Sequence, residues 1–176
     1  MSNMFVMEAV NLFCGDDDPT ASKHLTIDEL QLPGLQEMFA EHKAGGSRVA
    51  IDVPVGAIEK LTAPFKLKGT DPQLMSLFGL GSKIMNNYTA YGVVRDLRSG
   101  RAMEAKALMN GRLGKIGADA FKKGDLHGYD YEINAIMHYE LFFDGQEKYY
   151  FDFFTGSWRV DGNDENADTN QILHIG

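Results

Sequence analysis

The sequence predicts a mainly β protein, folded as an antiparallel β-barrel or sandwich with one flanking α-helix and a long extended hairpin. Apolar and polar residues alternate with a period of two in several segments, as in strands that bury one face. Turn pairs such as Asp144-Gly145 separate these segments, and only one segment has helical spacing. With 176 residues and 44% apolar content, the chain can bury a sizeable core. We therefore expect one domain over residues 1–176, with an extended, loop-rich segment at 156–176.

The first predicted strands flank a glycine pair. Residues 40–52 read AEHKAGGSRVAID, in which a mixed run reaches Gly45-Gly46 and then alternates, with Val49, Ile51 and Val53 on one side. Residues 61–68 form a second one-sided strand, because their apolar side chains occupy the odd positions. No segment of the chain is an obvious cover for the 40–52 hairpin. We therefore expect its strands to pair with another chain.

One helix is predicted, from Asp71 to Leu80. Asp71 can cap its N-terminus and Pro72 suits its first turn. An apolar stripe follows at helical spacing, formed by Leu74, Leu77 and Phe78. We expect this stripe to pack on the flank of the barrel.

The remaining strands form hairpins. Residues 88–97 and 102–116 flank a Ser99-Gly100 turn, and residues 148–154 return after Asp144-Gly145. The clearest strand is Tyr129 to Leu141, whose apolar face comprises Tyr129, Tyr131, Ile133, Ala135, Met137, Tyr139 and Leu141. We expect that alternation to continue unbroken for the whole strand, with Asp130, Glu132, His138 and Glu140 on the opposite, polar face.

Catalytic and metal-binding patterns are weak in this sequence. The single cysteine, Cys14, has no partner, and no histidine has the spacing of a metal site. His138 and Glu140 could share a cleft as an acid and base pair, although a solvated strand face explains them better. Asp16-Asp17-Asp18 suits a hard cation or an acidic turn, and residues 161–166 fail the calcium-loop pattern. We expect no enzyme activity and no cofactor.

Charge and hydropathy limit the partners. The net charge of −8 argues against binding to the phosphate backbone of nucleic acids, because that affinity comes largely from lysine and arginine. The apolar runs are far shorter than the roughly 20 residues of a membrane helix, and one cysteine suits a reducing cytoplasm. We therefore expect neither a membrane span nor specific nucleic-acid binding.

Several short motifs, taken in order, resemble one family from Asn11 to the C-terminus. They are NLF (11–13), LPGL (32–35), KAGG (43–46), IDVPVG (51–56), LFGL (77–80), LFFDG (141–145) and the closing VDGNDENADTNQILHIG. Their order and spacing are similar to those of the major tail tube protein of contractile-tailed bacteriophages and R-type tailocins. The aromatic run 149–154 and Trp158 depart from that pattern, and either thicken the core or enlarge an interface.

The resemblance implies that the protein forms six-fold rings, which stack into a hollow tube inside a contractile sheath. The implied partners are further copies of the chain, the sheath, baseplate and tail terminator proteins, a tape measure protein in the channel, and DNA that passes without specific binding. The implied location is the virion tail, reached from the host bacterial cytoplasm during assembly. Six copies at −8 would place −48 formal charges on a ring, so that the channel would repel phosphate.

Candidate residues follow for two roles. The loop formed by Lys43, Ala44, Gly45, Gly46 and Ser47 is the expected contact between subunits or rings. The expected channel-facing carboxylates are Asp52, Glu59, Asp130, Glu132 and Glu140. Two alternatives stay open, namely a related inner-tube component of bacterial secretion systems, and a small ligand-binding β-barrel with a pocket near His138.

Overall fold

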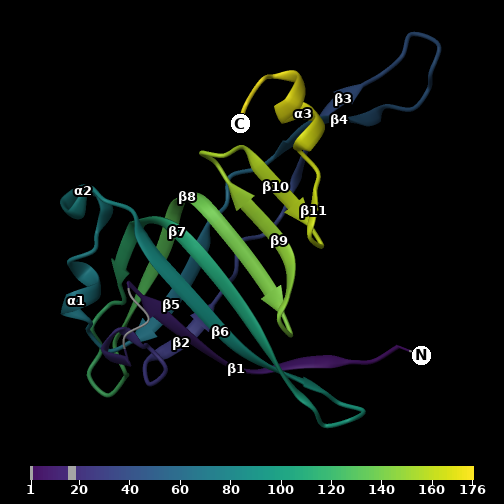
Figure 1. Cartoon of the computed structure of the whole chain (residues 1–176). Coiled ribbons are helices and arrows are strands. Elements are labelled where there is room, and N and C mark those ends of the chain that lie inside the picture. Colours follow the sequence, from purple (N-terminus) through teal and green to yellow (C-terminus); the bar gives the residue numbers. More distant parts are fainter. Residues whose placement is uncertain (1, 16–18) are drawn as a thin grey trace.

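The computed structural model describes residues 2–15 and 19–176, and they form a curled antiparallel sheet with a projecting hairpin (Figure 1). The large sheet runs in the order β1 (Phe5–Cys14), β6 (Asn86–Asp96), β7 (Ala102–Ala118), β8 (Gly128–Phe143), β9 (Gln146–Asp152), β10 (Ser157–Val160) and β11 (Asn163–Asp164). On another branch, β5 (Ala63–Lys68) pairs with β8 and with β2 (Ile27–Leu30). The mainly β prediction is confirmed, although the barrel does not close.

Strand β8 makes the sheet curl because its two halves have different neighbours. Its first half pairs with β5, from Gly128 to Ile133, and its second half pairs with β9, from His138 to Phe143. The curl brings the end of β1 near the start of the β2 branch, where the amide of Lys23 donates to the carbonyl of Leu12 at 2.9 Å. The enclosed space is filled by the core, whose largest fully buried side chains are Tyr88, Tyr131, Tyr139, Leu12, Leu67, Leu74, Met109, Leu113 and Ile133.

The predicted unbroken alternation in β8 is wrong at Ala135. Ala135 has φ of 49° and is exposed, whereas Ile136 is 7% exposed. Opposite this point, Asn110 pairs with His138 and Arg112 with Asn134, so β8 carries extra residues. This bulge shifts the phase of the strand, and Ile133, Ile136 and Tyr139 reach the core at intervals of three.

The predicted single helix is divided into α1 (Pro72–Met75) and α2 (Gly79–Ser82). Asp71 caps α1 as expected, because its carboxylate accepts from the amide of Leu74 at 3.0 Å. Phe78 breaks the helix with ψ of 125°, forms a bridge to Leu113 and is 37% exposed, so the predicted stripe buries only Leu74 fully. Packing on β7 therefore overrides the helical spacing.

Polar groups gather at the N-terminal end of α1. Lys23, 7% exposed, pairs with Asp71 at 2.6 Å. Burial raises the pKa of the nearby Cys14 thiol to about 12 and that of Tyr131 to about 12. These pKa values keep both groups neutral, so the Lys23–Asp71 pair supplies the charge at this end of α1.

The C-terminal segment is more ordered than predicted. Residues 156–176 contain β10, β11 and α3 (Ala167–Ile172). A further short 3-10 helix, η1, spans Pro19–Ala21 in the N-terminal part of the chain. Asn166 and Asn170 fasten α3 to the preceding turn through the carbonyl of Gly156, at 2.6 and 3.0 Å. Polar asparagine contacts of this kind give no apolar periodicity, which is why the sequence suggested loops.

Candidate assembly surfaces

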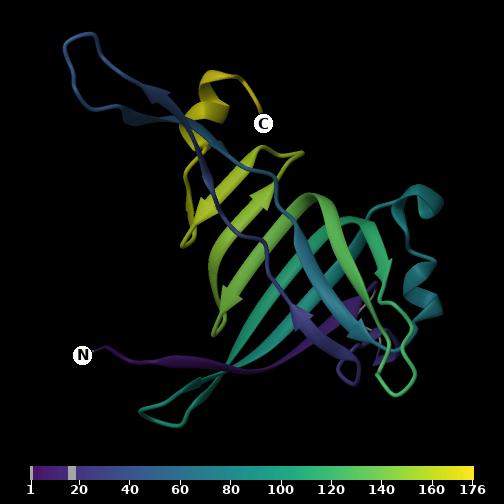
Figure 2. The same ribbon diagram turned by 180° about the vertical axis from the view of Figure 1, so that it is seen from behind.

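The hairpin of β3 (Glu37–His42) and β4 (Ile51–Ile58) is a separate two-stranded sheet. It projects beyond the body of the subunit in both views (Figures 1 and 2). Every residue from 37 to 57 is exposed. An isolated two-stranded ribbon is at best marginally stable in water, so this hairpin has the properties of a segment that docks on another surface.

The two faces of the hairpin differ in character. Because Ala40 pairs with Val53 and His42 with Ile51, one face carries His42 beside the apolar side chains of Met38, Ala40, Ile51, Val53 and Val55. On the other face Glu41 lies directly opposite Asp52, and like charges in that position destabilise a ribbon. Both the uncovered apolar face and the paired carboxylates favour a partner.

The predicted contact loop lies at the tip. The amide of Ser47 donates to the carbonyl of Ala44 at 2.9 Å, and all five residues from Lys43 to Ser47 are exposed. Neither Gly45 nor Gly46 has positive φ, and a Cβ at either would meet no atom within 4 Å. Nothing in the described part of this chain therefore requires glycine at the tip.

The five predicted channel carboxylates fall into two groups. Asp52 and Glu59 belong to the hairpin region, whereas Asp130, Glu132 and Glu140 lie on the face of β8 turned away from the core. Each of the β8 carboxylates has a partner within the chain: Asp130 lies 3.7 Å from Lys66, Glu132 accepts from Asn134 at 2.6 Å, and Glu140 lies 2.8 Å from His138. The structure thus brings three of the five onto one strand face.

That face carries paired charges of both signs. Lys66 donates to Asp119 at 3.1 Å, and this hydrogen bond lowers the pKa of Asp119 and raises that of Lys66. Lys68 lies 3.6 Å from Asp28, and Arg159 donates to Glu147 at 2.8 Å while covering the ring of Tyr150. These cations pair with carboxylates of their own chain. This face of the sheet is therefore less acidic than the net charge of the chain suggests.

His138 has two carboxylate partners rather than the one predicted. Its Nε2 lies 2.8 Å from Glu140 and its Nδ1 lies 3.0 Å from Asp152, on β9. The amide of Thr155 and then the His138 ring hold the pKa of Asp152 below its usual range. Each ring nitrogen thus contacts a carboxylate, and the contact with Asp152 fastens β8 to β9.

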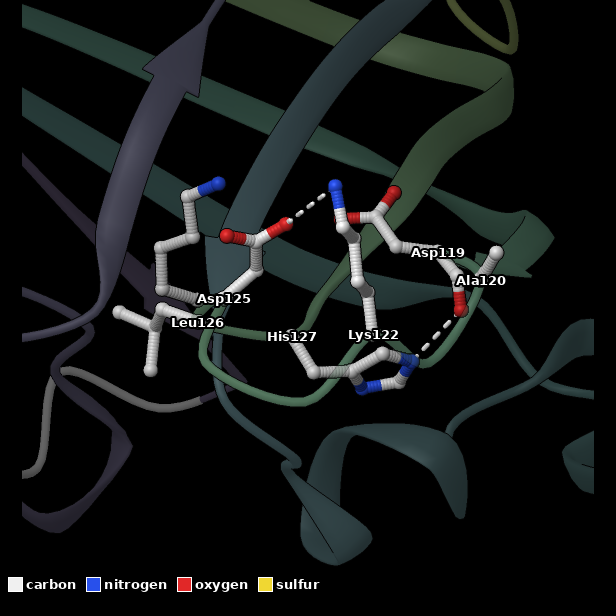
Figure 3. A pocket seen from close by; sticks show the side chains of 7 residues that line it. Asp119, Ala120, Lys122, Asp125, Leu126 and His127 are labelled. Carbon is white, nitrogen blue, oxygen red and sulfur yellow. Dashed lines mark hydrogen bonds and ion pairs between the residues drawn. The ribbon is translucent and has the colours of Figure 1, made fainter.

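A hollow lies on the loop before β8 (Figure 3). Its polar groups contact one another, because His127 Nε2 lies 2.6 Å from the carbonyl of Asp119, and Lys122 lies 3.9 Å from Asp125. In the described part of the chain, no group of three histidine, cysteine or acidic side chains could hold a metal ion, and no helix is long and apolar enough to cross a membrane. The Asp16-Asp17-Asp18 run lies outside the described residues.

Sequence reasoning missed two exposed apolar surfaces at the ends of the chain. Before and within β1, Met4 and Phe5 are 66% and 48% exposed. Near the other end, the C-terminal patch consists of the exposed side chains Phe153, Phe154, Ile172, Leu173 and Ile175. Within the aromatic run, Tyr149 and Phe151 pack against the core, whereas Phe153 and Phe154 are exposed.

A part-closed antiparallel β subunit with uncovered apolar projections is the architecture of a protein that assembles with other chains. The sequence model of the family described as phage tail tube protein FII matches residues 9–173, and the chain belongs to that family. It is a structural tail tube subunit, and its place is in the tail. The resemblance drawn from the motifs is confirmed.

Solved structures of contractile injection systems are similar to this chain. A chain of the PVC sheath–tube complex in the extended state has 9% identity over 73% of this chain and 86% of its own, with a TM-score of 0.48. A chain of the PVC sheath/tube terminator in the extended state has 12% identity over 77% and 92%, with a TM-score of 0.49. No curated protein matches the sequence.

Proposed function

We propose that copies of this subunit form six-fold rings that stack into a hollow tube inside a contractile sheath, and that the tube conducts DNA into the host cell. The exposed β3–β4 hairpin carries this proposal, since its apolar face has no cover within the described chain. Membership of the tail tube family supports the tube as the product of assembly. The subunit then works through geometry, without catalysis or a cofactor.

The proposal gives roles to the candidate residues. The loop from Lys43 to Ser47 contacts a neighbouring subunit, and Asp52, Glu59, Asp130, Glu132 and Glu140 face the channel. Carboxylates that hold the lysines of their own chain leave fewer cations for phosphate, which supports passage of DNA without specific binding. Residues 1–176 act as one domain, because one core cluster spans β1 to β9.

The proposed partners outside the tube are the sheath, baseplate and tail terminator proteins, with a tape measure protein in the channel. Assembly takes place in the host cytoplasm before the tail is complete. These roles require one end of the stacked tube to differ from the other, and the hairpin, which projects from one side of the subunit (Figure 2), supports such a difference.

Negative-stain electron microscopy across a concentration series tests the proposal. Hollow rings with six-fold class averages, or straight tubes with an axial channel, are expected. Monomers or dimers at every concentration would overturn it and would favour the ligand-binding barrel. Rings that never stack would favour the secretion-system component.

A further inference from the structure

The hairpin tip and the C-terminal segment carry opposite charges. Lys43 and Arg48 at the tip have no carboxylate within ion-pair distance among the described residues. The segment 161–168, with sequence DGNDENAD, has four acidic residues and no basic one. Within it, Asp161 pairs with Lys148 at 2.9 Å, and the other three acids have no cation partner in the described chain. The two basic residues at the tip are therefore complementary in charge to the C-terminal segment.

The same two segments also match in hydrophobicity. The hairpin exposes Val49 by 67% and Ile51 by 57% next to its basic tip. The C-terminal patch exposes Phe154 by 78% and Ile172 by 75% next to the acidic segment. Asn166 and Asn170 tie α3 to the turn that carries the two phenylalanines, so both parts of the patch belong to one anchored segment.

We propose that the β3–β4 hairpin of one copy docks on the C-terminal patch and the acidic segment of a second copy. Apolar side chains would meet at the centre, with Lys43 and Arg48 of one copy against Asp164, Glu165 and Asp168 of the other, as charged rims surround apolar interface centres. The contact is heterologous, because the hairpin and the patch are different surfaces. Each copy can therefore bind the hairpin of one neighbour on its patch and dock its own hairpin on another neighbour. This inference rests on the proposed function and names the surface that the hairpin meets.

Disulfide trapping tests the contact, and the chain suits it because Cys14 is buried, with its thiol pKa raised to about 12. The variant Val49→Cys/Leu173→Cys is assembled and oxidised. We expect a covalent ladder of dimers, trimers and larger species. The two single variants mixed together should give dimers only, which separates contacts between copies from closure within one chain. As a matched control, Leu80 is 77% exposed on α2, and Val49→Cys/Leu80→Cys should give no ladder.

Charge reversal gives a second readout that does not depend on oxidation. The variant Lys43→Glu/Arg48→Glu should raise the concentration needed for half-polymerisation about tenfold or more, since like charges then meet at the contact. Adding Asp164→Lys/Glu165→Lys to it should recover most of that loss. Normal assembly of the reversed variant, or a ladder with Leu80→Cys and none with Leu173→Cys, would overturn the docking and leave the patch for another component such as the sheath. If the unmodified chain forms no polymer at all, the proposed function fails instead.

Discussion

The Lys23–Asp71 pair gives the sharpest prediction for the stability of the subunit. Its atoms are 2.6 Å apart, with side-chain exposures of 8% for Lys23 and 21% for Asp71. Breaking a buried pair costs about 3–5 kcal/mol, and we expect about 2–3 kcal/mol for Asp71→Asn because the carboxylate is partly exposed. Asparagine keeps the cap on α1, so Asp71→Ala should cost about 1 kcal/mol more.

The loss arises from an uncompensated ammonium group, and a second variant tests this cause. Lys23→Met/Asp71→Asn removes both charges and keeps most of the buried volume, so it should be more stable than Asp71→Asn by at least about 1 kcal/mol. The assay is urea unfolding of dilute, unassembled subunit, followed by circular dichroism and by the fluorescence of Trp158, the only tryptophan. A loss below about 0.5 kcal/mol for Asp71→Asn, or a double variant no more stable than Asp71→Asn, would refute the reasoning.

Three further predictions use other parts of the structure. Gly111→Ala should destabilise the subunit by about 1–3 kcal/mol, because the new Cβ would lie 2.8 Å from the carbonyl oxygen of Asn134. The control variant Gly117→Ala should change stability little, because the nearest atom to its Cβ would be 4.0 Å away. The urea unfolding midpoints of the two variants test this difference. Gly46→Val should leave the urea midpoint nearly unchanged, since its Cβ would meet no atom, yet weaken polymerisation in a sedimentation assay; unchanged polymerisation would exclude close contact at the tip. The pKa of Asp119 is lowered, chiefly by its hydrogen bond from Lys66, so its stabilising effect is present above the unfolded pKa of about 3.9 and is lost as pH falls through the folded value. Unfolding midpoints of Asp119→Asn should accordingly lie below those of the unmodified chain at pH 7 and converge with them toward pH 2, and a constant gap would contradict the assignment.

Local patterns in the sequence determine most of the strands. The hairpin turns at Ser99-Gly100 and Asp144-Gly145 lie where the sequence predicts them, because turn chemistry acts over a few residues. The phase shift at Ala135 was not predictable, because alanine seldom adopts positive φ and the bulge depends on the register with β7. The division of the helix at Phe78 likewise depends on β7, which is distant in sequence.

In the candidate surfaces, too, features set by local sequence were predictable, whereas features set by contacts between distant segments were not. The hairpin tip was predictable from its Gly-Gly pair and its alternation, which both lie within thirteen residues. By contrast, the pairing of Lys66 with Asp119 and Asp130 joins three segments, and so does the attachment of α3 to the turn at Gly156. Partners of this kind are set by topology, so a list of carboxylates alone overstated how acidic the β8 face is.

The uncovered hairpin raises the question of why free subunits would not aggregate before the tube assembles. Charged side chains lie next to its apolar face, with Lys43 and Arg48 at the tip. Such charges are a common means of blocking unselective edge pairing, because any partner must neutralise them as well as cover the apolar face. A segment that offers both acidic residues and exposed apolar side chains meets the requirement at the tip, and the C-terminal segment of another copy has this composition. The same charges that delay aggregation would then select the partner.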